Sequence, residues 1–209
     1  MKEYGQNKIF VEGESDKKFI DFLLLQFFGI NVPDLVIDVK GKDRLRDNPL
    51  LINERRRSEN AKNLVIFDTD SIDKQGGRQK RLEEYQTVGT DLSVQLTIFL
   101  LPFNDDNEGL LENLLNTCLK EEFNFFDNCW DTMIECAKKS DIQNINLPAQ
   151  KAFLFSKIDL FKAHRSEKWD YKSSSKYLYE DDGIWEFDRD KNENLEKLLQ
   201  FIEDNLFNK

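Results

Sequence analysis

Four short apolar runs in the first part of the chain predict four β-strands. They occupy residues 8–11, 35–39, 64–67 and 94–101. The third run is apolar at every position, which is typical of a strand buried on both faces of a parallel sheet. The fourth run is rich in β-branched and aromatic residues, which favour strands. We therefore expect these runs to form one sheet.

Stretches with helical spacing separate the apolar runs. Apolar residues recur over 19–27, and we expect this helix to have Ser15 as its N-cap and to end at Gly29. Residues 78–85 and 110–115 also have helical patterns. Strands that alternate with helices indicate repeated βα units. The predicted fold class is α/β, with a mainly parallel four-strand sheet and helices on both faces.

From about residue 120 the pattern is predominantly helical. Residues 123–139 and 149–163 have amphipathic spacing, and a final helix carries a regular apolar stripe, made of Leu195, Leu198, Leu199, Ile202 and Leu206. We therefore predict an α/β core over residues 1–120 and a helical C-terminal extension over residues 121–209, packed on the core.

Acidic residues follow three of the predicted strands. Glu12 comes directly after the first strand, Asp68 and Asp70 after the third, and Asp105, Asp106 and Glu112 after the fourth. Ligands of open α/β sheets bind beyond the carboxyl ends of the strands, at the point where the strand order reverses. We therefore expect the first and third strands to be neighbours, so that Glu12 reaches Asp68 and Asp70. Carboxylate oxygens are the ligands that Mg²⁺ and Mn²⁺ prefer.

The spacing of two aspartates is weak evidence by itself, because the chain has 40 Asp and Glu residues among 209. A second Asp-x-Asp pair, at 188–190, follows no apolar strand, and we interpret it as turn and capping chemistry. Asp68 and Asp70 differ by the buried strand in front of them. Glu12 has the alternative of a helix-capping acid, and Glu112 that of a solvated acid near a helix start.

The charge of the chain limits its modes of nucleic-acid binding. A net charge of −10 argues against a protein that coats nucleic acid through bulk charge. Two basic clusters are available locally, residues 55–57 and the group of Arg78, Lys80 and Arg81. The second cluster lies close in sequence to the acidic tip, so it is the better candidate for contacts with nucleic acid. Its alternative is a solvated helix face.

Cysteine and histidine usage argues against a zinc site. The chain has three cysteines, Cys118, Cys129 and Cys136, without a CxxC motif, and one histidine, His164. We expect free buried thiols in a reducing cytoplasm. No apolar run approaches the roughly 18 residues that span a membrane, and the polar start shows no secretory leader. The expected location is cytoplasmic, without membrane association.

Three motifs resemble a known superfamily. The stretch 11–16, Val-Glu-Gly-Glu-Ser-Asp, resembles the first motif of the TOPRIM domain, and 67–70 resembles its Asp-x-Asp motif. Residues 101–112 are similar to the Pro-Asp-Asn…Gly…Leu-Glu stretch of small stand-alone TOPRIM-like proteins, mostly bacterial and archaeal, of the DUF3226 group. The order of residues 40–43 before the Asp-x-Asp strand fits this group too. The TOPRIM resemblance covers roughly residues 7–120, and the resemblance to the group covers nearly the whole chain.

The resemblance implies a Rossmann-like TOPRIM fold with a metal site. Glu12 would be the general acid/base or a metal ligand, and Asp68 and Asp70 would bind the metal. OLD-type nucleases, which are more distant relatives, hold a second metal with an acid after the next strand. Glu112 occupies that region here.

One departure from the group's pattern leaves the identity of the acid after the fourth strand undecided. Phe103 stands where the group has an aspartate, and the nearby acids are Asp105 and Asp106. The lysine that nuclease relatives use in the transition state is not placed by any motif. Its candidates are Lys151, Lys157 and Arg165.

The expected function is Mg²⁺- or Mn²⁺-dependent phosphoryl transfer, namely a nuclease acting on nucleic-acid phosphodiesters. The alternative is a non-catalytic module that binds metal or a nucleotide, or that regulates a partner ATPase. TOPRIM nucleases often work beside ATPase domains, and this chain has no Walker motif. DNA or RNA as substrate, one or two metals, and the oligomeric state stay open.

Overall fold

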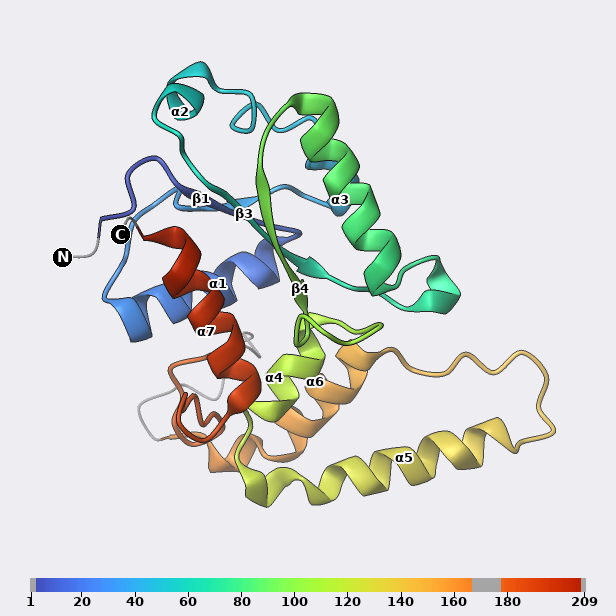
Figure 1. Cartoon of the computed structure of the whole chain (residues 1–209). Helices are drawn as coiled ribbons and strands as arrows, with labels where there is room; N and C mark the ends of the chain where they lie inside the picture. Colours follow the sequence, from blue (N-terminus) through green and yellow to red (C-terminus); the bar gives the residue numbers. More distant parts are fainter. Residues whose placement is uncertain (1–2, 167–177, 208–209) are drawn as a thin grey trace. The chain divides into compact units, whose positions relative to one another are not determined.

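The computed structural model describes residues 3–166 and 178–207 (Figure 1). The chain divides into two compact units, which we name by their content. The sheet unit comprises Met1–Leu114 and Glu193–Lys209, and the helical unit comprises Leu115–Asn192.

The sheet unit contains a parallel sheet of four strands in its described residues. These are β1 (Lys8–Val11), β2 (Val36–Asp38), β3 (Asn63–Asp68) and β4 (Leu96–Leu101), in the order β2-β1-β3-β4. Each strand coincides with one of the four apolar runs. The predicted neighbourhood of the first and third strands is confirmed, because β1 pairs with β3. The order reverses between these two strands, which is the topological switch point of such a sheet.

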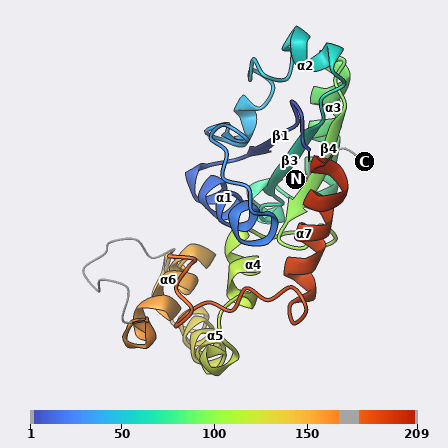
Figure 2. The ribbon, with the colours of Figure 1, turned by 90° about the vertical axis from the view of Figure 1, so that its left-hand side faces the viewer.

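Helices cover both faces of the sheet, as expected (Figure 1). Side chains alternate between the faces of a strand. Phe10, Val65 and Phe67 point into a core cluster with residues of α3 (Arg78–Leu92), including Tyr85. The opposite side of the sheet carries α1 (Glu14–Phe28) and α7 (Glu193–Leu206), and Figures 1 and 2 both show α7 beside β4.

Helix α1 begins closer to β1 than the sequence pattern predicted. Its N-cap is Gly13 rather than Ser15, because the side chain of Asp16 accepts a hydrogen bond from the backbone N–H of Gly13 at 3.1 Å. The predicted end is confirmed, since Gly29 has φ = 67°, a left-handed conformation suited to glycine. The helix therefore starts two residues after Glu12 and brings Asp16 back toward the strand.

Helix α7 is part of the sheet unit, whereas the sequence pattern assigned everything after residue 120 to a helical extension. Its apolar stripe is buried as predicted, at Leu195, Leu198, Leu199, Ile202 and Leu206. The ring of Phe201 lies 5.2 Å from that of Phe99 in β4. In addition, Asn7 donates a hydrogen bond from Nδ2 to the carbonyl of Leu206 at 2.6 Å. These contacts explain why α7 groups with the sheet.

The connection from β2 to β3 is irregular. It contains a 3-10 turn at Lys42–Arg44 and a short helix α2 (Glu54–Ser58). The predicted basic run at 55–57 lies in α2, but its central residue is not a surface charge. Arg56 is buried and donates to the backbone carbonyls of Gln6, Leu50 and Lys62. Arg56 therefore holds the chain together instead of facing a phosphate backbone.

The helical unit contains α5 (Phe125–Lys138) and α6 (Gln150–Leu160), with short 3-10 turns at Glu121–Phe123 and Lys162–His164. Helix α4 (Leu111–Thr117) begins in the sheet unit and ends in this one. The expected aromatic packing is present: Trp130 contacts Phe153, and Trp185 is buried. Trp169, and most of the loop expected at 170–182, lie outside the described residues.

Three smaller expectations have clear outcomes. His164 is exposed, as expected. The pair at 188–190 forms a turn in which Asp188 accepts from the backbone N–H of Asp190 at 2.9 Å. The cysteine prediction was wrong in part, because Cys118 is buried but Cys129 and Cys136 are exposed on α5.

No helix among the described residues is long and apolar enough to cross a membrane.

Candidate functional site

Glu12 lies at the carboxyl end of β1, between the strand and Gly13. Its Oε2 atom is buried and has no hydrogen-bond partner among the described residues. Burial raises the pKa of Glu12, and the negative charges of Asp70 and Asp16 raise it further, against the opposing charges of Lys42 and Arg81. The result is a carboxyl group that binds a proton more readily than an exposed glutamate.

Asp68 is the last residue of β3, next to the end of β1. Its Oδ1 atom accepts a hydrogen bond from the backbone N–H of Leu111 at 2.8 Å. Burial raises the pKa of Asp68 well above its usual range, and the charges of Asp16, Glu12 and Glu112 add to this effect. Four carboxyl groups from three segments are thus close enough to influence one another. We call Glu12, Asp16, Asp68 and Glu112 the carboxylate cluster.

Asp70 has a different environment. Its Oδ2 atom accepts hydrogen bonds from Nζ of Lys42 at 2.8 Å and from the guanidinium of Arg81 at 2.6 Å. Burial alone would raise the pKa of Asp70, but these two cations outweigh it and lower the pKa. The backbone N–H of Asp70 donates to the carbonyl of Gly109, which fastens it to the loop after β4. Asp70 is therefore an ionised carboxylate held between two positive charges.

A tight turn carries the chain from Asp70 to α3. At Gly76 a Cβ atom would lie 2.5 Å from the Cβ of Asp70, so the backbone passes too close for any other residue. The N–H of Gly77 then donates to the carbonyl of Thr69, which fixes the start of α3 beside the end of β3. Arg81 follows one turn later and points inward, where only 2% of its side chain is exposed.

The predicted basic group separates in the structure. Arg81 reaches the site and also pairs with Glu84 at 2.5 Å. Arg78 points elsewhere and donates from Nε to the carbonyl of Asn104 at 2.8 Å. Lys80 is exposed and lies 4.0 Å from Glu84. Of the three predicted contacts, Arg81 is the one that joins the acidic residues.

Of the three candidate acids that follow β4, Glu112 is the one whose charge acts on Asp68. Glu112 is 7% exposed, and its charge contributes to the raised pKa of Asp68. Asp105 instead pairs with Lys197 of α7 at 3.1 Å, and Asp106 is exposed. The structure therefore brings Glu112 to Asp68 and leaves the two loop aspartates outside the carboxylate cluster.

The three candidates for the transition-state cation, Lys151, Lys157 and Arg165, lie in the helical unit and make other contacts there. Lys157 is fully buried, and its Nζ donates to Asp127 at 2.6 Å and to Asn116 at 2.9 Å. Its charge is thus balanced inside the unit. Arg165 is buried near Asp181, and Lys151 is exposed above the ring of Phe155.

Sequence reasoning missed three residues of the site. Asp16 is absent from the predicted site residues, although it lies only four positions after Glu12 in the sequence. Lys42 follows β2, whose carboxyl end lies at the same edge of the sheet, so its position was also readable. Nothing in the sequence around Tyr85 indicates a place in the site, apart from its spacing of four residues from Arg81 on α3. Its buried hydroxyl has no partner among the described residues, and the charge of Glu12 contributes to its raised pKa.

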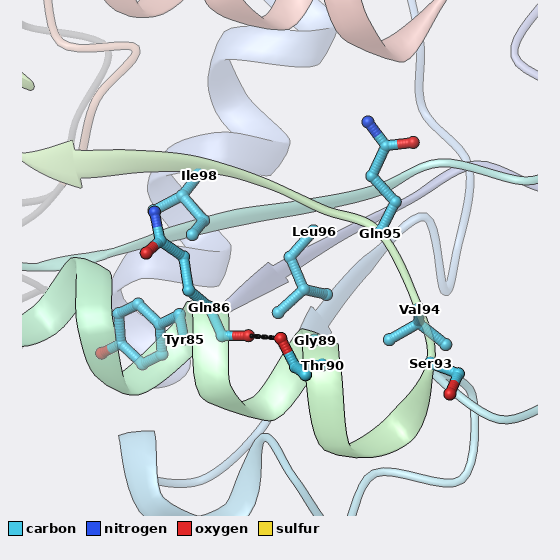
Figure 3. A pocket seen from close by; sticks show the side chains of 9 residues that line it. All are labelled: Tyr85, Gln86, Gly89, Thr90, Ser93, Val94, Gln95, Leu96 and Ile98. Atoms are coloured by element: carbon cyan, nitrogen blue, oxygen red, sulfur yellow. Dashed lines mark hydrogen bonds between the residues drawn. The ribbon is translucent and has the colours of Figure 1, made fainter.

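The ring of Tyr85 also borders a hollow of about 570 Å³ between α3 and β4 (Figure 3). The other lining residues are uncharged, such as Gln86, Thr90 and Gln95. In Figure 3 the hydroxyl of Tyr85 points away from them. This hollow has no group suited to acid, base or metal chemistry, so we do not regard it as the functional site.

The donor set of the carboxylate cluster fits a hard divalent cation. Within residues 3–166 and 178–207, no three acidic, histidine or cysteine side chains converge in a geometry that would hold a metal ion as they stand. Nevertheless, Glu12 has a buried oxygen without a partner among the described residues, and the charges of three other carboxyl groups act on Asp68. Burial is the main cause of both raised pKa values, and a cation here would relieve the repulsion that adds to it. Glu12, Asp68 and Glu112 are the residues that could hold it.

Comparisons with known proteins give one match. The model of a family described as a protein of unknown function (DUF3226) matches residues 6–204. This range includes residues of both the sheet unit and the helical unit. No curated protein and no solved structure matches the chain significantly.

Proposed function

The chain belongs to the DUF3226 family of proteins of unknown function, and from this premise we propose that it is a metal-dependent phosphoryl-transfer enzyme, a nuclease acting on phosphodiesters. The observation that carries the proposal is the environment of Asp68. This half-buried carboxyl group lies at the switch point of the sheet, where burial and the charges of three other acids raise its pKa, and Lys42 and Arg81 bind Asp70 two residues on. Acids that hold a cation, next to cations that bind phosphate, are the requirements of phosphodiester cleavage.

Each group has a defined role in this proposal. Asp68 and Glu112 hold Mg²⁺ or Mn²⁺, which supplies charge neutralisation and an acidified water when bound. In place of a role as ligand, Glu12 holds or releases a proton at Oε2, because its raised pKa suits general acid–base chemistry better than that of an exposed glutamate. Lys42, whose side chain is 27% exposed, binds the phosphate oxygens, and Asp70, itself held by the nearly buried Arg81, orients it for that purpose.

The superfamily assignment is part of the same proposal. The Glu-Gly turn after β1, the Asp-x-Asp after β3 and the parallel order β2-β1-β3-β4 together support a TOPRIM-type fold. A relation to OLD-type nucleases rests on the acid after β4, for which Glu112 is the candidate. In this proposal, Lys42 has the role of the lysine that nuclease relatives use in the transition state, which no motif had identified.

A specific observation favours a second candidate function. Asp70 is occupied by two cations, and its pKa is lowered rather than raised. A carboxylate committed to this ion-pair network is less available as a metal ligand. The alternative is therefore a non-catalytic module that binds metal or a nucleotide and works with a partner ATPase.

A cleavage assay with a matched control separates the two functions. Circular DNA and single-stranded RNA are incubated with the protein and Mg²⁺ or Mn²⁺. We expect cleavage by the wild type and its loss in Asp68→Ala, with a decrease of roughly 100-fold or more in Glu12→Gln. Asp190→Ala, in the second Asp-x-Asp pair, keeps full activity. Metal binding by calorimetry without cleavage of either substrate would favour the module.

A further inference from the structure

A cavity of about 640 Å³ lies between the end of β4 and α7, wholly within the sheet unit. Three aromatic rings, those of Phe99, Phe103 and Phe201, form its apolar lining. Phe99 is buried beneath, whereas Phe103 and Phe201 are half-buried and present part of their surface to the cavity. Pockets of roughly 300–1,000 Å³ accept small molecules, so the volume suits a single nucleotide.

The cavity is joined to the carboxylate cluster through α3. Arg78 lines the cavity, and Arg81 binds Asp70. Residues three apart on a helix have Cβ atoms roughly 5–6 Å apart, although the side chains of Arg78 and Arg81 reach different partners here. The loop after β4 makes the second connection: Asn104 lines the cavity, and Gly109 of the same loop accepts from the N–H of Asp70. The cavity therefore begins one helical turn from the candidate site.

The two cations of the cavity differ in their availability. Lys197 is paired with Asp105 at 3.1 Å and with Glu193 at 4.0 Å. Arg78 makes a side-chain hydrogen bond through Nε to the carbonyl of Asn104. In the described part of the chain no carboxylate forms an ion pair with its guanidinium. Arg78 is thus the positive charge that an anionic ligand group would meet here.

The remaining polar groups restrict the rest of the ligand. Acidic side chains of α7, among them Glu196 and Asp204, also line the cavity and repel phosphate, so only the end at Arg78 suits an anionic group. Asn205 uses its Nδ2 as a donor to the carbonyl of Phe201, which leaves its amide oxygen as an acceptor. The lining therefore favours a neutral, flat, aromatic group that offers N–H donors at its edge. A purine or cytosine base has these properties.

We propose that this cavity binds one unpaired nucleobase of the substrate, stacked on Phe103, with the attached phosphate on Arg78. This rests on the proposed function, because it names the part of the substrate that lies next to the cleaved bond. A base in a paired duplex has both faces covered by its neighbours, so the substrate is single-stranded or has an unpaired end.

Calorimetry with guanosine monophosphate and with guanosine, both without divalent metal, tests the proposal. Phe103→Leu keeps an apolar side chain but removes the aromatic face, so we expect both ligands to bind roughly 5- to 100-fold more weakly. Phe103→Tyr keeps the ring and the affinity. Arg78→Gln weakens binding of the monophosphate and leaves that of guanosine unchanged. Gln86→Ala, in the hollow of Figure 3, is the control that alters neither.

A second measurement avoids dependence on a folded variant. Addition of guanosine monophosphate to the wild type should shift the NMR resonances of Phe103 and Arg78, and leave those of Gln86 in place. Absence of binding by the wild type overturns the proposal. So does binding of a cationic dipeptide such as Trp-Lys in its place, which would make the cavity a protein-docking site.

The outcome is separable from that of the proposed nuclease. Binding of the monophosphate, sensitive to Phe103→Leu, together with no cleavage of any nucleic acid, contradicts the nuclease and keeps the base site. Cleavage that is unaffected by Phe103→Leu, with no binding of the monophosphate, contradicts the base site and keeps the nuclease.

Discussion

The guanidinium of Arg81 lies 2.6 Å from Oδ2 of Asp70, although the two residues belong to different segments around the tight turn at Gly76. Arg81 is 2% exposed, whereas Asp70 is 25% exposed. A nearly buried guanidinium needs a counter-charge, because an unpaired charge in a protein interior is strongly destabilising. Asp70 therefore stabilises the fold at the same position where it orients cations for a ligand.

Removing that counter-charge should destabilise the sheet unit. We expect Asp70→Ala to lower the free energy of unfolding by roughly 1–3 kcal/mol, because Arg81 keeps Glu84 as a second partner. Urea denaturation measures this change. Asp91→Ala removes an exposed partner of Arg46 and is the control, with an expected change of about 0–1 kcal/mol. Equal stabilities of the two variants would show that the Asp70–Arg81 pair contributes nothing.

The carboxylate cluster should make stability fall as pH rises. The pKa values of Glu12 and Asp68 are raised in the folded state. Above the ordinary carboxyl pKa of about 4, the unfolded chain has released these protons and the folded chain still holds them. The free energy of unfolding is therefore highest below that pKa for these groups. Their contribution is lost as pH rises through the raised folded-state values.

Asp68→Asn tests this pH dependence, because the amide has the shape of the carboxyl group and cannot ionise. Denaturation curves between pH 4.5 and pH 8, roughly spanning the ordinary carboxyl and neutral ranges, should show a smaller loss of stability in the variant. At neutral pH the variant should be as stable as the wild type or more stable. A variant that is less stable by the same amount at every pH would contradict the raised pKa of Asp68.

A divalent metal ion should relieve the repulsion within the carboxylate cluster and stabilise the folded protein. A ligand that binds only the folded state stabilises it by about 2.7 kcal/mol at one hundred times its dissociation constant. We expect Mn²⁺ and Mg²⁺ to raise the melting temperature at neutral pH, and Asp68→Asn to reduce this effect strongly. Asp190→Asn should respond like the wild type. A shift of the same size in all three proteins would indicate binding outside the cluster.

The three cysteines should react at different rates with a thiol reagent. Burial raises the pKa of Cys118 to about 12, so this thiol is neither accessible nor ionised at neutral pH. Cys129 and Cys136 are exposed on α5. Native protein should therefore release two equivalents of reporter quickly, and the third only after denaturant is added. Loss of the fast phase in a Cys129→Ser, Cys136→Ser double variant identifies its source.

The sheet could be predicted from the sequence because most residues of its strands are apolar. A strand buried on both faces, such as Asn63–Asp68, has a continuous apolar run that is visible in the sequence. The acids at the end of such a strand indicate the functional edge of the sheet. The neighbourhood of β1 and β3 also followed, since Glu12 and Asp68 needed a common edge.

The contacts around the site were not readable, because they depend on tertiary placement. Nothing local distinguishes Arg56, which is buried against backbone carbonyls, from the exposed arginines on either side. Likewise, Lys42 reaches Asp70 across 28 positions of sequence, which include the irregular connection with α2 and the whole of β3. Charge patterns in sequence indicate where charges occur. They do not show which of them the fold turns inward.

The hydrogen bond from Asn7 to the carbonyl of Leu206 joins residues 199 positions apart. The sheet unit is therefore discontinuous, with the helical unit inserted between its two parts. On the ribosome, β1 to β4 emerge first, but the face that α7 covers stays open until residues after Glu193 are made. Phe99 and its neighbours would be exposed during that interval, which is a period of aggregation risk for a nascent chain. The inserted helical unit thus sets the delay between making the sheet and closing it.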